Sequence, residues 1–190
     1  MVRSGYKYGV LVSMVMLTAV GLMAQTSRYE EMLARVDTGQ YLPDEAWLID
    51  VDGDTVYYEQ FRGKWLIIDY WLPGCRPCIK AFPEWNAFYQ DRDSSKVNII
   101  NVFVDSSPAQ WERRRKRNNI QFPAYYGGWD LDNALLALDL ETTYSADGKL
   151  QVRTSAPKYV LIDPSGKIVT KAFPKPSDGK VFERLQLWRG

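Results

Sequence analysis

A mostly apolar run that leads into the only two cysteines of the chain limits its fold more than any other feature. The run spans Trp65 to Trp71 and is bounded by turn residues, which is typical of a central strand covered on both faces. A Pro-Gly turn follows, and Cys75 and Cys78 then open what the pattern predicts to be a helix. Residues three apart on a helix share a face, so the two sulfurs can form or open a disulfide. The stretch therefore predicts redox chemistry.

Composition narrows the remaining choices. The chain has 190 residues, of which 46% are apolar, and this suffices for one well-formed core. Its 24 Lys and Arg residues nearly balance its 23 Asp and Glu residues, which argues against a nucleic-acid binder. The chain contains no histidine, so histidine-based triads and haem or copper sites with histidine ligands are excluded.

The N-terminus has the layout of a secretory signal peptide. Arg3 and Lys7 precede an uncharged run from Gly9 to Met23, and Ala24 is a small residue at a suitable cleavage point. The run is shorter than the roughly 20 residues of a membrane-spanning helix, which favours cleavage near Ala24 over an uncleaved membrane anchor. We expect an exported, periplasmic protein, in an oxidising compartment where a cysteine pair can exist as a disulfide.

The rest of the chain is expected to form one α/β domain with a mixed central sheet that helices cover on both faces. The expected division is a signal peptide at 1–24, a short helical segment at 25–45 and the domain at 46–190. Hydrophobic periodicity and turn residues predict a hairpin over 46–58, strands over 65–71 and 97–104, helices over 75–89, 109–118, 131–140 and 178–187, and a hairpin over 159–170. We expect 122–129 to be an aromatic loop and 142–155 to be a loop or an irregular strand.

A cluster of basic residues is not explained by the predicted fold. Residues 113–117 form a run of five basic side chains on a predicted helix. A solvated helix face is the favoured interpretation, and a patch for an acidic partner or a membrane surface is the alternative.

The ordered set of motifs resembles the thioredoxin superfamily, and in particular its exported TlpA/ResA-like thiol-disulfide oxidoreductases. The resemblance covers about 46–187. It is carried by the leading hairpin, 61–69, Tyr70-Trp71, the Cys-x-x-Cys of 75–78, Phe82-Pro83 and 155–163. It implies a thioredoxin-like fold with an N-terminal β-hairpin extension.

The same resemblance implies roles for residues far from the cysteines. Pro157 is expected to be a cis-proline that faces the cysteine pair, and Ala156 to offer its backbone N–H and C=O to an extended substrate. Asp69 matches the buried acid of thioredoxin. The candidate substrate-binding residues are Trp71, Gly74, Arg76, Pro77, Ala156 and Pro157.

Two positions depart from the family pattern. Gly74 stands where the family usually places a tryptophan, and Ala81 stands where the ResA-like branch carries a glutamate. These departures remove an aromatic wall and a carboxylate from the expected site. The stretch between Tyr144 and Pro157 also looks longer than usual, and we expect it to reshape the substrate groove.

The chemistry assigned to the pair follows from its place at a helix N-terminus. The positive end of the helix dipole and the neighbouring Arg76 favour a Cys75 thiolate, which makes Cys75 the nucleophile and Cys78 the resolving cysteine. Pro77 suits the first turn of a helix because it has no N–H to leave unpaired. Asp69, if buried, has a raised pKa and can take the proton from Cys78; the alternative is a satisfied polar residue at a strand end.

Other uses of two cysteines fit less well. A permanent disulfide staple would close a very small loop and gain little. A zinc site needs four ligands, usually cysteine or histidine, and this chain has only two such residues. Cu(I) assembly proteins on this fold use a longer cysteine spacing and a histidine. Peroxidases on this fold place their reactive cysteine in a different sequence context. No metal or cofactor is expected, and the expected partners are protein dithiols and disulfides, with a membrane thiol-disulfide donor as a further candidate. A reductase is favoured; a dithiol oxidase and a peptide-binding or chaperone-like module with little turnover remain the alternatives.

Overall fold

Strand β3 (Trp65–Trp71) is an interior strand of the sheet in the computed structural model, which describes residues 30–105, 107–128, 133–147 and 150–179. Within these residues seven strands form one sheet in the order β2-β1-β5-β4-β3-β8-β9. β3 pairs in parallel with β4 and antiparallel with β8, so the expected mixed sheet is confirmed. The other strands are β1 (Trp47–Ile49), β2 (Thr55–Tyr57), β4 (Val97–Val104), β5 (Ala124–Gly128), β8 (Lys158–Ile162) and β9 (Ile168–Thr170).

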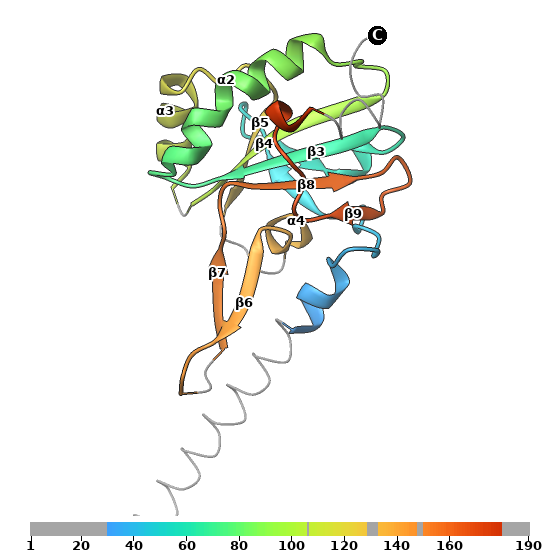
Figure 1. Ribbon diagram of the computed structural model, residues 1–190, viewed down its shortest axis with the longest axis vertical. Coiled ribbons are helices and arrows are strands. Elements are labelled where there is room, and N and C mark those ends of the chain that lie inside the picture. Colours follow the sequence, from blue (N-terminus) through green and yellow to red (C-terminus); the bar gives the residue numbers. More distant parts are fainter. Residues whose placement is uncertain (1–29, 106, 129–132, 148–149, 180–190) are drawn as a thin grey trace, which may run out of the picture.

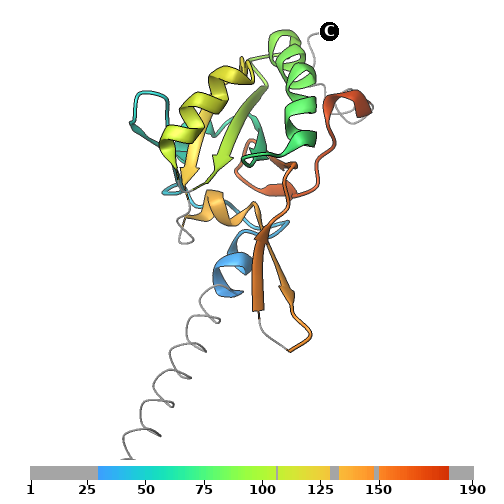
Figure 2. The same cartoon turned by 90° about the vertical axis from the view of Figure 1, so that its left-hand side faces the viewer.

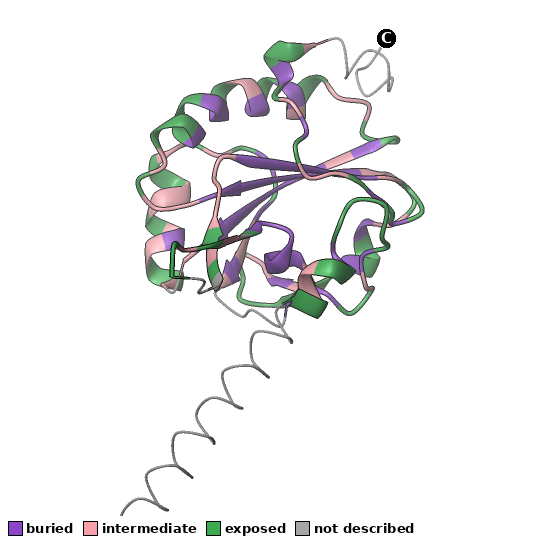
Figure 3. Cartoon of the chain, turned by 60° about the horizontal axis from the view of Figure 1, so that its bottom comes forward, coloured by how far each residue is buried: buried purple, intermediate pink, exposed green. Residues whose placement is uncertain are grey.

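Helices cover both faces of this sheet, as the sequence predicts. Helices α2 (Arg76–Asp91) and α3 (Pro108–Arg117) lie on one face, and α4 (Ala134–Ala137) lies with the helical residues 30–35 on the other (Figures 1 and 2). Side chains alternate along a strand, so Ile67 and Trp71 pack toward α2 and α3, whereas Ile68 and Tyr70 pack toward α4. The central strands β3, β4 and β8 are almost entirely buried between these layers (Figure 3).

Helix α2 binds the sheet through one apolar stripe. Its buried side chains include Cys78, Phe82, Trp85 and Phe88, which recur at intervals of three or four residues. Pro83 lies inside the helix with its side chain exposed. The stripe fixes Cys78 against the sheet and leaves the residues before it at the surface.

The hairpin extension at the N-terminal side is present, and the preceding segment packs on the domain. β1 pairs with β2 and joins the sheet through β5. Val36 and Leu42 are each 1% exposed in the core beside α4, and Tyr41 bridges to Lys167. The predicted signal peptide and most of the predicted helix over 178–187 lie outside the described residues. In the part that is described, no helix has both the length and the apolar character needed to cross a membrane.

The aromatic segment predicted as a loop is instead strand β5. It pairs in parallel with β4 and antiparallel with β1, and thereby links the hairpin extension to the central strands. Gly127 and Gly128 weaken its strand pattern, but neighbours on both edges satisfy its backbone groups. Tyr125 and Tyr126 are half-buried on this strand.

Two other predictions between 131 and 155 also need correction. The helix expected over 131–140 is shorter in the described part, where α4 spans four residues and β6 (Leu140–Tyr144) starts soon afterwards. The segment expected as a loop or irregular strand forms a regular antiparallel pair of β6 and β7 (Leu150–Thr154). This β6–β7 hairpin projects from the body of the domain, beside the helical residues 30–35 (Figures 1 and 2).

Candidate active site

Cys75 and Cys78 form a disulfide at the N-terminal end of α2, with their Cα atoms 5.4 Å apart. Cys75 is the N-cap residue, and its Sγ accepts a hydrogen bond of 3.3 Å from the backbone N–H of Cys78. The two sulfurs differ in access, because Cys75 is half-buried whereas Cys78 is 1% exposed. An external disulfide can therefore reach Cys75 and not Cys78, which matches the predicted division between nucleophile and resolving cysteine.

A tight turn delivers Cys75 to the end of the helix. The backbone N–H of Cys75 donates to the carbonyl of Leu72 over 3.2 Å, and Gly74 has a φ of 79°. Proline followed by glycine at positive φ is the pattern of a type II turn. A tryptophan at position 74 would be strained in this conformation, so the glycine there follows from the shape of the turn. Apart from Gly74 and its two chain neighbours, no described atom lies within 4 Å of the position where a side chain would begin.

The segment before β8 supplies the other side of the site. The Ala156–Pro157 peptide bond is cis, as the resemblance implied. Ala156 packs against the cluster formed by Trp71, Cys78, Phe82, Phe103 and Trp111, against which Cys75 also packs. The cysteine pair and the cis-proline segment thus meet over one apolar base, although about 80 residues separate them in the chain.

A buried carboxyl group lies on the same face of the sheet. Asp69 is 1% exposed, and burial raises its pKa to about 7 although a hydrogen bond from Asn101 opposes the shift. Asn101 Nδ2 donates to Asp69 Oδ2 over 2.9 Å, and Trp71 Nε1 donates to Asn101 Oδ1 over 2.6 Å. Within the described structure the second oxygen, Oδ1, has no hydrogen-bond partner. The role of Asp69 as a proton acceptor, rather than as a polar residue at a strand end, therefore stays a prediction.

The structure separates the remaining candidate residues by exposure. Arg76 and Pro77 are exposed in the first turn of α2, where a substrate can contact them. Trp71 is completely buried and packs on Phe82 and Phe103 with ring centroids 5.2 and 4.7 Å apart. The prediction of Trp71 as a substrate-binding residue is thus corrected: its indole supports the cysteine pair from beneath and hydrogen-bonds to Asn101.

Three residues near the site escaped the sequence-based assignment. Asn101 is a polar residue in the middle of an apolar strand, and that interruption was the signal available for it. Trp111 of α3 and Tyr126 of β5 form a ring contact at 5.9 Å beside the cysteine cluster, and the Tyr126 hydroxyl donates to the carbonyl of Asp105 over 2.8 Å. Only the pairing of β5 with β4 brings these two side chains together.

Ala81, which stands where the ResA-like branch carries a glutamate, is buried in the core. Its side chain is 5% exposed, in the cluster that contains Ile67 and Trp85. A carboxylate is therefore missing from this buried position on the active-site helix. Across the described residues there is also no cluster of three or more histidine, cysteine, aspartate or glutamate side chains that could hold a metal ion.

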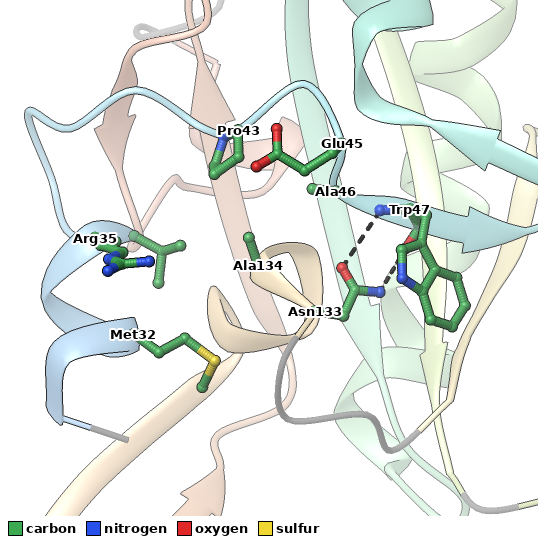
Figure 4. Close-up of a pocket in the computed structure, with 9 residues that line it drawn as sticks. Met32, Arg35, Pro43, Glu45, Ala46, Trp47, Asn133 and Ala134 are labelled. Atoms are coloured by element: carbon green, nitrogen blue, oxygen red, sulfur yellow. Dashed lines mark hydrogen bonds between the residues drawn. The ribbon is translucent and has the colours of Figure 1, made fainter. Parts of the chain in front are cut away.

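A cavity of about 250 Å³ lies elsewhere, between the helical residues 30–35, β1 and α4 (Figure 4). Arg35 and Glu45 contribute charged groups to its lining. Asn133 accepts a hydrogen bond from the backbone N–H of Trp47 and donates one to the carbonyl of the same residue. The cavity thus lies where Asn133, just before α4, is hydrogen-bonded to β1, and it shares no residue with the cysteine site.

Comparison with known proteins agrees with this geometry. The Redoxin family model matches residues 37–184. The chain belongs to the Redoxin family. It is 28% identical over 141 residues to the thiol-disulfide oxidoreductase ResA of Geobacillus kaustophilus, covering 74% of this chain and 80% of that protein. With ResA of Bacillus cereus strain ZK / E33L it shares 24% identity over 183 residues, covering 94% of each chain.

Solved structures show the same fold. A thiol-disulfide oxidoreductase from Bacteroides vulgatus superposes with a TM-score of 0.62 at 23% identity, covering 80% of this chain and 96% of the other. The thioredoxin domain of a second oxidoreductase from that organism gives a TM-score of 0.58 at 23% identity, covering 79% and 98%. The Redoxin match and the similarity to the ResA proteins, together with this fold, identify the chain as a ResA-like thiol-disulfide oxidoreductase of the thioredoxin superfamily.

Proposed function

We propose that the protein reduces disulfides of exported proteins. The observation that carries the exchange mechanism is the unequal exposure of the two cysteines, with Cys75 half-buried and Cys78 completely buried. In the reduced enzyme the Cys75 thiolate attacks a substrate disulfide, forms a mixed disulfide and releases one substrate sulfur as a thiolate. Cys78 then attacks Cys75, and the second substrate thiolate leaves. Two electrons pass to the substrate, and the enzyme ends with the Cys75–Cys78 disulfide.

Asp69 is the proposed proton acceptor for the second step. Cys78 has to lose its proton before it can attack, and water has little access to it. An acid with a pKa of about 7 is partly ionised at neutral pH, so it can take a proton and return it. Asp69 lies on the face of β3 that packs under α2, two residues before the Trp71 side chain that contacts the cysteine cluster.

The reducing direction requires that a Cys75 thiolate be only modestly stabilised, and two features of the site support this. Arg76 is exposed, so water and salt screen its charge. One backbone N–H donates to Cys75 Sγ, from Cys78. A weakly stabilised thiolate makes the dithiol form less favoured and the pair less oxidising. A membrane thiol-disulfide donor would then reduce the Cys75–Cys78 disulfide for the next cycle.

The direction is tested by equilibrating the cysteine pair against a glutathione series. A reductase should have a potential well below that of DsbA, which is about −120 mV. A value near −120 mV would contradict the proposed direction and would favour a dithiol oxidase. Insulin reduction by the parent, compared with Cys75→Ser, tests turnover: equal rates would contradict the nucleophile assignment.

Compartment and clients need separate experiments. The predicted signal peptide supports export, and N-terminal sequencing of the protein recovered from the periplasm should find cleavage near Ala24. Cys78→Ala should leave Cys75 in mixed disulfides with client proteins, because the resolving sulfur is missing. Recovery of the protein from the cytoplasm with residues 1–24 intact would contradict the proposed location.

A further inference from the structure

The β6–β7 hairpin lies directly upstream of the cis-proline. Strand β7 ends at Thr154 and β8 begins at Lys158, so the three residues between them are Ser155, Ala156 and Pro157. Strand β6 pairs with β7 along its whole length, and Glu141 of β6 stands opposite Arg153. The position of the cis-proline segment therefore depends on this hairpin at one end and on the central sheet at the other.

One side chain of the hairpin contacts both flanks of the segment. Glu141 Oε1 accepts a hydrogen bond of 2.8 Å from Ser155 Oγ, and Lys158 Nζ lies 3.4 Å from the same oxygen. Ser155 precedes the Ala156–Pro157 dipeptide and Lys158 follows it. The bond from Ser155, followed by the charge of Lys158, lowers the pKa of Glu141 and keeps it ionised at neutral pH.

Lys158 gives this contact a fixed anchor. Its side chain is 6% exposed, and Nζ also donates to the backbone carbonyl of Asp139 over 3.2 Å. The neighbouring strand residue is Tyr70, so Lys158 points to the face away from the cysteines, where Tyr70 packs. Because the ammonium group is buried and held by the chain after α4, Glu141 is tied to a rigid part of the fold.

We infer that Glu141 is a positioning residue that holds the Ala156–Pro157 segment at the cysteine pair, so that an extended segment of a protein substrate can pair with the Ala156 backbone. The inference rests on the proposed function and deepens it. A polypeptide that binds by strand pairing needs the Ala156 N–H and C=O at fixed positions. A small disulfide needs only access to Cys75, so Glu141 selects for polypeptide substrates.

Disulfide exchange in the Cys78→Ala background tests this inference for either redox direction. Two probes share one leaving group: a synthetic peptide whose single cysteine is capped with thionitrobenzoate, and the small disulfide 5,5′-dithiobis(2-nitrobenzoate). Release of thionitrobenzoate gives the rate of attack by Cys75 on each probe. We expect Glu141→Ala to lower the rate with the peptide about three- to tenfold and to leave the rate with the small disulfide within twofold.

Two further variants separate positioning from general damage. Glu141→Gln keeps a side-chain oxygen that can accept from Ser155 and Lys158, so it should recover most of the peptide rate. Tyr144→Phe removes a hydrogen bond of 2.7 Å between the same hairpin and Glu30, away from the cis-proline, and should change neither rate. The pH profile of the small-disulfide reaction should not move, because Glu141 does not act on the Cys75 thiolate.

The outcomes are distinguishable. Equal losses with both probes, or an unchanged peptide rate in Glu141→Ala, would overturn the role of Glu141 while leaving the oxidoreductase intact. Absence of any exchange that depends on Cys75 would contradict the proposed function, and this inference with it.

Discussion

Two carboxyl groups are buried on opposite sides of the sheet, and they differ in their charged neighbours. Asp69, on the cysteine side, has a neutral hydrogen-bond donor in Asn101, and burial raises its pKa to about 7. Asp139, on the α4 side, is also completely buried, but the positive charge of Lys158 opposes the effect of burial and its pKa rises to about 6. Neither Asp139 carboxylate oxygen has a hydrogen-bond partner in the described structure.

The comparison of Asp69 with Asp139 shows how a neighbouring cation changes the protonation of a buried acid. An acid buried without a cation exchanges its proton near neutral pH, which suits a group that serves the cysteines. An acid buried near a cation is ionised over more of the physiological range, because the positive charge favours the carboxylate. Both arrangements cost stability at neutral pH, and the cost is larger for Asp69 because no cation opposes the effect of its burial.

The largest expected effect is the pH dependence that Asp69 imposes on stability. Its pKa is about 7 in the folded protein and about 3.9 in an unfolded chain, so the folded state binds the extra proton between these values. The parent therefore loses stability as the pH rises from about 4 to about 7. Asp69→Asn should remove this loss, a relative gain on the order of 3–4 kcal/mol at pH 8 compared with pH 4. Urea unfolding of the disulfide form measures it.

The matched control is Asp91→Asn, which changes an exposed carboxylate at the end of the same active-site helix. It should leave the pH dependence unchanged. If Asp69→Asn and Asp91→Asn gave the same profile, Asp69 would not be the titrating group.

Removal of the cation should have the next largest effect. Lys158→Met leaves Asp139 buried without a positive neighbour on β8 and also removes the ion pair between Lys158 and Glu141. We expect the folded protein to lose about 2–4 kcal/mol of stability at pH 8. The loss is smaller than for a fully buried ion pair because Glu141 is half exposed. Lys167→Met, at an exposed position near the same strand, should stay within about 0.5 kcal/mol. Similar losses of stability in the two variants would contradict a specific role of Lys158 in stabilising the buried Asp139.

Asp139→Asn should act like Asp69→Asn but more weakly. The shift of its pKa is smaller because Lys158 offsets burial, so the relative gain at pH 8 over pH 4 should be on the order of 2 kcal/mol. The same urea series measures it. A gain larger than that of Asp69→Asn would invert the comparison between the two sides of the sheet.

The smallest change concerns the neutral partner. Asn101→Leu removes the donor that favours the ionised form of Asp69, so the pKa of Asp69 should rise by about one unit. Infrared titration of the carboxyl stretching band follows it directly. Asn98→Leu, on the same strand but the opposite side, serves as the control, and an equal shift there would point to a general effect of the strand.

The central parts of the fold could be predicted because local pattern and family motif agree there. The apolar run of β3 and the Cys-x-x-Cys at a helix start follow from the residues themselves, and the cis-proline at 157 follows from the family resemblance. The β5 strand could not be predicted from its residues, since Gly127 and Gly128 weaken the pattern and pairing with β1 and β4 supplies the stabilisation. The β6–β7 hairpin was missed because its strands hold few apolar residues.

The site shows the same limit. Spacing identifies Cys75 and Cys78, but it does not reveal that Trp71 would be buried beneath them or that Asn101 would join Asp69 to Trp71. These links run between neighbouring strands and depend on the register of β3 against β4. Sequence alone predicts the chemistry of the pair, whereas the surroundings of Asp69 and of Ala156 come from tertiary contacts.

The turn at Gly74 makes the protein a selective target for covalent probes. With open space beside Cys75 and Cys78 buried beneath it, a bulky maleimide or iodoacetamide reagent can approach one sulfur of the reduced protein and not the other. Labelling after reduction should therefore stop at one adduct per chain, placed at the entrance of the substrate surface. A fluorophore or a biotin attached there would report directly on the occupancy of that entrance by a client.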